Sequence, residues 1–269
     1  FTLAWTSAIP GYFILSARAT NAVGEAGVSA DVTIRVPGPF GGIRWAVPGL
    51  IEAEHYDVGG QSVGYSDTTV ANEGGQYRTN ESVDIAASAA ASNGFLVGWV
   101  RATEWMNYAV NIQSTATYQI RVRVASGSAG GTFHIEVNGI NVTGAITVPN
   151  TGAWRTFQWV NKVVDLTQGQ AVIRVVMDAN GAAGCVGDFD CMQIVPYTPP
   201  SQDPYLGSPV NLPGLVEVEN FDTGGPDVAY YDTTVANEGG RYRLDESVDI
   251  GAGALVSNGY YVGWVRAGE

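Results

Sequence analysis

The chain has 269 residues, of which 45% are hydrophobic, and this length favours about two globular domains. Asp and Glu number 26 against 13 Lys and Arg, so the formal net charge of −13 disfavours binding to a phosphate backbone. Because no stretch approaches the roughly 18 consecutive apolar residues of a membrane span, we expect neither nucleic acid nor membrane as a partner.

Residues 1–36 are predicted to form two strands and a turn. The run GYFILSA alternates, NAVGEAG carries turn residues, and VSADVTIRV alternates again. Two strands cannot bury a core by themselves. The segment resembles the closing hairpin of a bacterial immunoglobulin-like domain whose first strands would precede Phe1. An unrelated β-hairpin is the alternative.

Two segments rich in proline and glycine are predicted to be linkers, residues 37–49 and residues 197–213. Their prolines and glycines are spaced so that neither a helix nor a central strand can propagate. Both lead into Pro-Gly-Leu followed by Ile-Glu or Val-Glu. We therefore predict a complete domain over residues 50–196 and a truncated domain over residues 214–269.

Within residues 50–196 the apolar period is two almost throughout. The runs TYQIRVRV and TFHIEV alternate, which predicts strands with one face on a core and one in water. AVIRVVM, residues 171–177, is apolar at nearly every position and is predicted to be covered on both faces. AASAAAS is too short for a helix. Many short strands between glycine-rich turns predict an all-β sandwich.

The two cysteines, Cys185 and Cys191, stand close together among glycines. A disulfide that closes one loop of a secreted protein is one interpretation. Two small buried thiols are the other. Zinc is not expected, because no pair of cysteines or histidines stands near them in the sequence.

One stretch occurs twice. SDTTVANEGGQYRTNESVDI begins at Ser66, and YDTTVANEGGRYRLDESVDI begins at Tyr231, at a constant offset of 165 residues. A period of that length indicates two domains of one kind. The second copy stops at Glu269, where the first continues with Trp105. We expect its core, aromatic cleft and metal site to be incomplete, and the chain to be part of a larger protein.

Five motifs in one order carry a family resemblance: IEAEHYD, DTTVANEGGQYR, GFLVGWVRATEWMNY, TGAWRTF and VGDFDCMQI. Together they resemble the family 6 carbohydrate-binding modules of secreted bacterial polysaccharide hydrolases. The resemblance covers Leu50 to about Val195 and, as a truncated copy, Leu215 to Glu269. It implies a jelly-roll β-sandwich of the galactose-binding-like kind, a sugar site at the loop end, a structural calcium and an extracellular location. We expect a monomer.

A neutral polysaccharide is bound by flat aromatic rings and a few fixed polar groups. Tyr77, Trp154 and Asp188 each follow turn residues, and by resemblance they match the apical cleft, two rings holding a sugar and Asp188 accepting hydrogen bonds. Asparagine is more usual at the last position in this subgroup. Packing at the edge of the core is the alternative for the two aromatic residues. Further expected sugar-binding residues are Glu73, Gln76, Trp105 and, in the second copy, Tyr242.

Trp105 lies on the strand predicted for WMNYAVNI, on the face opposite Met106 and Tyr108. Some members of the resembled family also bind sugar on the concave face of the sheet, which is one role for this residue. A buried tryptophan that covers that face is the other.

Glu52 and Glu54 are two apart on a predicted strand, so both carboxylates are expected on one face. Two like charges there require a cation between them. The resemblance implies calcium, with Asp190 as a third ligand and backbone carbonyls completing the shell. Glu217 and Glu219 repeat the pair.

These observations predict non-catalytic polysaccharide binding by a segment of a larger glycoside hydrolase, with β-1,3-glucan as the ligand and agarose or xylan as alternatives. A glycosidase would need two carboxylates about 5 to 10 Å apart across a cleft. Glu73, Glu81 and Glu104 lie in turns or at strand ends without a catalytic motif, so no catalytic residue is predicted. An adhesin or cell-surface matrix protein is the alternative class.

Overall fold

The structure is a computed structural model that describes residues 9–269. The chain divides into two units, Phe1–Tyr197 and Thr198–Glu269. The described residues form strands and three short 3-10 helices, with no α-helix among them: η1 (Phe40–Gly42), η2 (Ala53–His55) and η3 (Val218–Asn220). None of these helices has the length and apolarity needed to cross a membrane.

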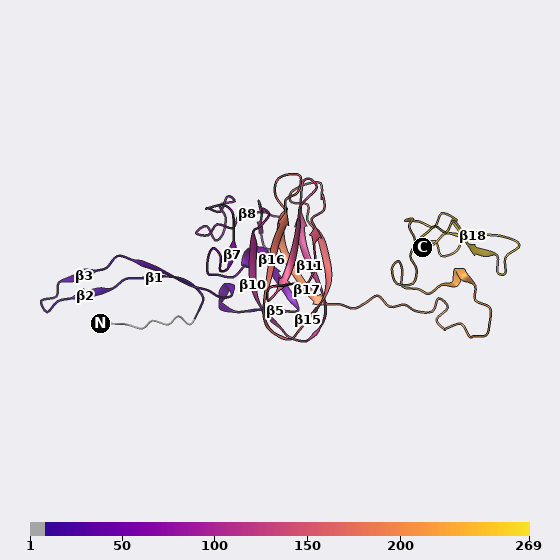
Figure 1. Cartoon of the computed structure of the whole chain (residues 1–269), viewed down its shortest axis with the longest axis horizontal. Coiled ribbons are helices and arrows are strands. Elements are labelled where there is room, and N and C mark those ends of the chain that lie inside the picture. The colour runs from indigo at the N-terminus through magenta and orange to yellow at the C-terminus, as the bar shows by residue number, and fades with distance from the viewer. Residues whose placement is uncertain (1–8) are drawn as a thin grey trace. The chain divides into compact units, whose positions relative to one another are not determined.

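The first described strands form one antiparallel hairpin, drawn in indigo in Figure 1. β1 (Gly11–Leu15) pairs with β4 (Val32–Val36), and β2 (Arg18–Thr20) pairs with β3 (Ala26–Val28). The side-chain oxygen of Asn21 accepts hydrogen bonds from the backbone amides of Val23 and Glu25, and these bonds close the turn between β2 and β3. The first eight residues of the predicted 1–36 segment lie outside the described residues, and its immunoglobulin-like identity stays a prediction.

Seven strands of the first unit form one sheet. Its order is β13-β12-β16-β10-β5, with β14 paired to β12 and β7 paired to β10. The strands are β5 (Trp45–Val47), β7 (Tyr65–Ser66), β10 (Trp105–Ile112), β12 (Thr132–Val137), β13 (Ile140–Asn141), β14 (Ile146–Thr147) and β16 (Gly169–Ala179).

Six strands form the opposing sheet. Its order is β15-β11-β17-β9-β8, with β6 paired to β17. The strands are β6 (Gly49–Glu52), β8 (Ile85–Ala87), β9 (Phe95–Val97), β11 (Ala116–Ala125), β15 (Gln158–Leu166) and β17 (Asp188–Pro196). The long strands of both sheets stand together in the central body of Figure 1.

The core lies between the two sheets and follows the period-two pattern. On β11, Tyr118, Ile120 and Val122 are buried while the residues between them are half-buried. β10 is buried at every position from Met106 to Val110. Each fully buried aliphatic or aromatic side chain contributes about 1.5 to 3 kcal/mol. The predicted all-β jelly-roll sandwich is therefore confirmed.

Two details of the sequence-based interpretation are wrong. Residues 45–47, assigned to the linker 37–49, form strand β5, which pairs in parallel with β10 and buries Val47. An edge strand of three residues can form between prolines, whereas a central strand cannot. Residues 171–177 were also predicted to be covered on both faces. Only one face is fully buried, because Val172, Arg174 and Val176 are half-buried on the outer side of the sheet.

The second unit contains β18 (Ile250–Ala252), β19 (Tyr260–Val262) and η3, at the offset that relates them to β8, β9 and η2. Arg266 pairs with Glu238 as Arg101 pairs with Glu73 in the first unit. The apolar side chains of this unit are more exposed. Val216 is 52% exposed, whereas its counterpart Ile51 is 1% exposed on the core side of β6.

Candidate functional site

A pocket of about 390 Å³ opens where the loops of the sandwich meet the first residue of β17. Its lining combines two tryptophans, one acidic and one basic side chain, a thiol and two small or apolar residues: Trp99, Trp154, Asp188, Arg155, Cys185, Ala183 and Leu96. Two aromatic rings beside one acid and one base form a lining suited to a ligand with apolar faces and hydroxyl groups.

The two tryptophans reach the pocket from separate loops. Trp99 follows β9 directly and has a positive φ of 53°, and Trp154 lies between β14 and β15. They remain 41% and 37% exposed. Neighbouring glycines leave space for the site: a Cβ on Gly127 would lie 2.9 Å from the indole nitrogen of Trp154, and a Cβ on Gly98 would lie 2.9 Å from Asp188 Oδ1. A larger residue at either glycine would therefore crowd Trp154 or Asp188.

Asp188 is the most buried polar residue of the pocket, at 8% exposure. Its side chain has no hydrogen-bond partner within residues 9–269. Burial raises its pKa to about 7, and the positive charge of Arg155 opposes that rise. Arg155 is itself held by a hydrogen bond from Nη1 to the carbonyl of Ala87, 3.1 Å away. The carboxyl oxygens of Asp188 open to the pocket and are free to accept hydrogen bonds from the hydroxyl groups of a ligand.

Tyr77 does not line this pocket, although the sequence places it opposite Trp154. Its ring packs against Phe95 at 5.0 Å and lies 5.8 Å from the ring of His55, whose Nε2 is 3.2 Å from the Tyr77 hydroxyl. The half-buried ring extends the core instead. The turn at Gly75 does present Tyr77 with a positive φ of 48°, but it directs the ring toward η2.

The other residues predicted from the Tyr77 loop also lie elsewhere. Glu73 Oε2 is 3.2 Å from Arg101 Nη2, and the exposed Gln76 is tied to the loop through its backbone. Neither lines the pocket. Trp105 is half-buried on the outer face of β10, where the guanidinium carbon of Arg174 lies 4.2 Å from the ring centroid. The cation covers this ring, so Trp105 is neither fully buried nor fully open.

The remaining acidic candidates for catalysis have structural partners. Glu81 accepts hydrogen bonds from the hydroxyls of Tyr12 and Tyr56 and pairs with Arg78 Nη2 at 2.7 Å. Glu104 is also buried and accepts hydrogen bonds from the hydroxyl of Thr68 and from the backbone amide of Arg101, at 2.5 and 2.8 Å. These contacts account for both side chains without a catalytic role.

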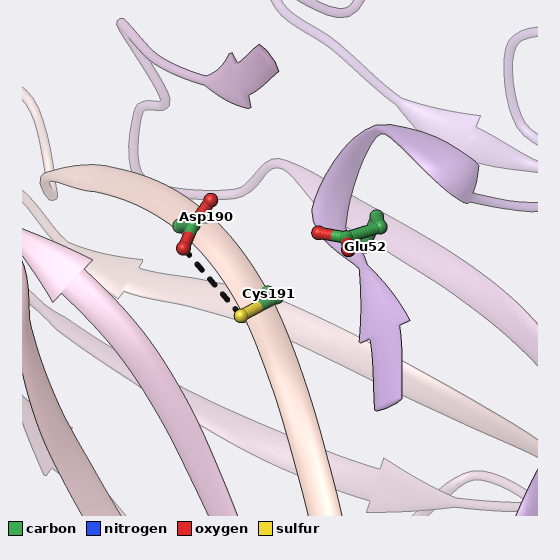
Figure 2. A group of neighbouring side chains, drawn as sticks. All are labelled: Glu52, Asp190 and Cys191. Atoms are coloured by element: carbon green, nitrogen blue, oxygen red, sulfur yellow. Dashed lines mark hydrogen bonds between the residues drawn. The ribbon is translucent and has the colours of Figure 1, made fainter. Parts of the chain in front are cut away.

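Two of the three predicted metal ligands, Glu52 and Asp190, lie together at the end of β6. Glu52 lies at the end of β6 opposite Asp190 on β17 (Figure 2), whereas Glu54 lies in η2, so the strand predicted for both glutamates is wrong. The 3-10 turn carries Glu54 into the interior at 0% exposure. Cys191 joins the group instead, with donor atoms of Glu52, Asp190 and Cys191 all within 4.8 Å of one another.

The charges around this group show what it can hold. Ser92 Oγ donates to Glu52 Oε2 at 2.5 Å, and Arg123 Nη1 pairs with Asp190 Oδ2 at 2.5 Å. Glu54 Oε1 accepts from the side chain of Asn93, but its Oε2 is buried without a partner within the described residues. Burial, with a smaller contribution from the negative charges of Glu52 and Asp190, raises the pKa of Glu54 to about 7. An unpaired buried carboxylate oxygen beside two more carboxylates fits a cation.

No disulfide joins the two cysteines, so that interpretation is wrong. Cys185 is half-buried in the pocket wall, and Cys191 is buried in β17. Burial and the adjacent charge of Asp190 raise the pKa of the Cys191 thiol to about 12.

In the second unit, Tyr242 repeats the packing of Tyr77. Its hydroxyl donates to Asn220 Oδ1 at 2.9 Å and its ring stacks on Tyr260 at 4.8 Å. Trp264 repeats the positive φ of Trp99, at 53°, and is half exposed. The sequence-based analysis missed Trp99. The available signal was a tryptophan directly after Val-Gly in both copies, because a bulky residue between a glycine and the next strand belongs to a turn.

Comparison with known proteins gives a family match that includes every residue of the pocket lining. The model of the carbohydrate binding module, family 6, matches residues 73–196. An isomaltosyltransferase of Sporosarcina globispora is 29% identical over 102 residues, and the clotting factor G alpha subunit of Tachypleus tridentatus is 36% identical over 67 residues. These matches cover 38% and 24% of this chain but only 9% and 10% of those proteins.

Solved structures of carbohydrate-binding modules are similar to about half of the chain. The C-terminal family 6 module of a marine laminarinase from Zobellia galactanivorans is 26% identical with a TM-score of 0.41, covering 54% of this chain and 97% of that one. A β-1,3-glucan-binding family 6 module from Bacillus halodurans is 20% identical with a TM-score of 0.43, covering 56% of this chain and 98% of that one.

Proposed function

Residues 73–196 form a family 6 carbohydrate-binding module, and from this premise we propose that the pocket between Trp99 and Trp154 holds a sugar residue of a polysaccharide. The observation that carries this proposal is the buried carboxyl of Asp188, which faces the pocket without a hydrogen-bond donor in the described chain. Sugar hydroxyls supply such donors.

Each group of the pocket has a role in this proposal. The indoles of Trp99 and Trp154 cover the C–H faces of a pyranose ring, Asp188 accepts hydrogen bonds from its hydroxyls, and the guanidinium of Arg155 donates to its oxygens. Trp99 takes the place that the sequence assigned to Tyr77. Covering one apolar face with each indole contributes about 1.5 to 3 kcal/mol.

The loss of translational and rotational freedom on binding costs several kcal/mol and offsets part of this gain. A single pocket therefore yields a dissociation constant in the micromolar to millimolar range. Binding of that strength suits a module that keeps an attached protein near its polysaccharide and is strengthened when copies are linked. The module itself is a binding domain without catalytic groups in its pocket.

We propose β-1,3-glucan as the polysaccharide, with agarose and xylan as alternatives. A pocket, in contrast to a flat row of aromatic rings, suits a chain end or an exposed sugar. We also propose that the chain is an extracellular segment of a larger glycoside hydrolase, acting as a monomer. The acidic net charge supports a neutral partner, since it repels polyanions. An adhesin or matrix protein is the second candidate, favoured by the hairpin and second unit that flank the module.

A structural calcium is a further part of the proposal. Glu52 and Asp190 offer carboxylate oxygens within 4.8 Å of each other. Glu54, whose pKa is raised in part by the charges of both, has an Oε2 atom without a partner in the described chain. Hard oxygen donors of this kind suit Ca²⁺. The cation would join the end of β6 to the start of β17.

Isothermal titration of the whole chain with laminarin, agaro-oligosaccharides and xylo-oligosaccharides tests the function. Binding of laminarin with a dissociation constant in the range above is the expected result. A preference for one of the other two sugars corrects the ligand and keeps the site. If none of the three binds, sugar recognition by this pocket is refuted.

A further inference from the structure

Trp99 enters the pocket from a backbone conformation that a bulky residue rarely adopts. Its φ of 53° lies in the left-handed region, which is unfavourable for side chains other than those of glycine, asparagine and aspartate. A residue keeps such a conformation only when the surrounding structure holds it there. The contacts that hold the chain around Trp99 therefore decide where its indole lies in the pocket.

Backbone hydrogen bonds fix the chain on both sides of Trp99. The amide of Gly98 donates to the carbonyl of Asp84 at 2.9 Å, and the carbonyl of Val100 accepts from the amide of Val186 at 2.8 Å. Asp84 directly precedes β8, and Val186 lies two residues before β17. Trp99 is thus tied to the loop before β8 on one side and to the loop before β17 on the other.

A pair of side chains closes the first of these contacts into a ring around Trp99. Arg101 Nη2 lies 3.2 Å from Glu73 Oε2. The amide of Glu73 donates to Asp84 Oδ1 at 2.5 Å, and the carbonyl of Asp84 accepts from Gly98. The chain from Gly98 to Arg101 completes this salt-bridged ring and carries Trp99. Its only link between two side chains is that of Arg101 with Glu73.

Glu104 holds the backbone of Arg101 from the other side. Its Oε2 accepts a hydrogen bond from the amide of Arg101 at 2.8 Å, and its Oε1 accepts one from the hydroxyl of Thr68 at 2.5 Å. The backbone of Arg101 is therefore held independently of its guanidinium. Removal of the guanidinium should loosen the ring at Glu73 and leave this second attachment intact.

The second unit repeats the salt-bridged ring at the offset of 165 residues. Arg266 Nη2 lies 2.8 Å from Glu238 Oε2. The amide of Glu238 donates to the side chain of Asp249, and the amide of Gly263 donates to its carbonyl. The tryptophan within this ring, Trp264, has the same φ of 53°. Because the apolar side chains of this unit are more exposed, the ring depends on its own segment and not on a packed sandwich.

From these contacts we propose that Arg101 is a positioning residue of the sugar pocket, which holds the indole of Trp99 in place through its pair with Glu73. The proposal rests on the function proposed for this pocket. Arg101 is not among the lining residues, so it acts through Trp99 and not by contact with the sugar. Without the pair, the loop gains freedom that sugar binding must remove again, and the affinity falls. Glu73, which the sequence assigned to sugar binding, then contributes by fixing Arg101.

Isothermal titration of the whole chain with laminarin tests the proposal through a cycle of two substitutions. Arg101→Ala should weaken binding about threefold to tenfold, and less than Trp99→Ala, because a mobile indole still makes part of its contact. The double variant should bind as Trp99→Ala does, since Arg101 has nothing to position once the indole is removed. An unchanged affinity in Arg101→Ala, or a further loss in the double variant, overturns the proposal.

The second unit supplies the matched control. Arg266→Ala breaks the same pair outside the pocket and should leave the laminarin affinity unchanged. A loss equal to that of Arg101→Ala would show a general effect of removing such a pair, and the proposal would be overturned.

A readout without sugar separates this proposal from the function on which it rests. The indole N–H resonance of Trp99 is identified by its absence in Trp99→Phe. It should shift or broaden in Arg101→Ala and stay unchanged in Arg266→Ala, whereas an unchanged resonance in Arg101→Ala overturns the proposal. If the unmodified chain binds none of the three sugars, the proposed function fails, and this resonance still decides whether Arg101 positions Trp99.

Discussion

Trp99 and Trp154 line one pocket although they belong to loops at the ends of different sheets. Trp99 follows β9 in the six-stranded sheet, and Trp154 follows β14 of the seven-stranded sheet. Asp188, the first residue of β17, lies in the same lining. The sandwich thereby brings together three groups that no local sequence pattern connects.

Removing either indole should abolish most of the sugar affinity. We expect Trp99→Ala and Trp154→Ala each to weaken laminarin binding at least tenfold, because each loses about 1.5 to 3 kcal/mol of apolar contact and 1.4 kcal/mol corresponds to a factor of ten. Isothermal titration of the whole chain measures the loss. The matched control is Trp159→Ala, since this tryptophan is equally exposed, at 37%, but lies outside the pocket beside Arg121. Equal losses in all three variants would contradict the assignment.

Tyr77→Ala should lower stability and leave the sugar affinity within about threefold of the unmodified chain. The ring packs against Phe95 and is half-buried, so its loss should lower the free energy of unfolding by about 1 to 3 kcal/mol. Thermal unfolding and laminarin titration of the same sample separate the two effects. If Tyr77→Ala keeps its stability but loses its affinity for laminarin, Tyr77 belongs to the sugar-binding site.

The sequence predicted those features that depend on local chemistry. Alternation in TYQIRVRV specifies a half-buried strand, and β11 buries Tyr118, Ile120 and Val122 as expected. Asp188 and Trp154 share one lining, as the resemblance implied. The partner ring could not be chosen in this way, because Tyr77 and Trp99 both follow glycines in turns. Only the path of the chain after β9 decides that Trp99 enters the pocket.

The metal cluster shows a second kind of limit. Glu52 and Asp190 were predicted together, but the place of Cys191 depends on strand register and on a bulge at Asp190. Register is set by pairing across the sheet, which sequence spacing does not contain. For the same reason the linker assignment missed β5, whose three residues gain their hydrogen bonds from β10.

Two Arg–Glu pairs of the first unit, Arg78–Glu81 and Arg101–Glu73, should differ sharply in their contribution to stability. Arg78 and Glu81 are 2.7 Å apart with side chains only 8% and 2% exposed, so Arg78→Ala leaves a buried carboxylate uncompensated and should cost about 3 to 5 kcal/mol. Arg101 and Glu73 are 34% and 43% exposed, so solvent screens this pair, and Arg101→Ala should change stability by about 1 kcal/mol or less. Urea denaturation of both variants makes the comparison. Similar costs would mean that burial does not set the strength of these pairs.

Asp188 should make stability depend on pH in a direction opposite to that of an ordinary salt-bridged carboxylate. Its pKa is raised by burial to about 7 in the folded chain, against roughly 3.9 for an unfolded aspartate. The folded state therefore holds a proton that the unfolded state has lost between these values, so stability falls as pH rises from about 4 to 7. Replacing the group in Asp188→Asn removes this dependence and should stabilise the chain relative to the unmodified protein above pH 7.

The quantity to measure is the difference in the free energy of unfolding between Asp188→Asn and the unmodified chain. Burial also raises the pKa of Glu54 to about 7 and that of Asp84 to about 6, so these groups titrate over the same pH range in both proteins. Urea denaturation from pH 4 to 8 should show the curves of Asp188→Asn and the unmodified chain diverging as pH increases. The exposed Asp165→Asn serves as the control and should follow the unmodified chain. Sugar affinity should rise over the same range only where Asp188 is present, since an ionised carboxylate forms the stronger hydrogen bonds to hydroxyls. Parallel stability curves for all three proteins would mean that folding leaves the pKa of Asp188 unchanged, which would contradict its burial in the pocket wall.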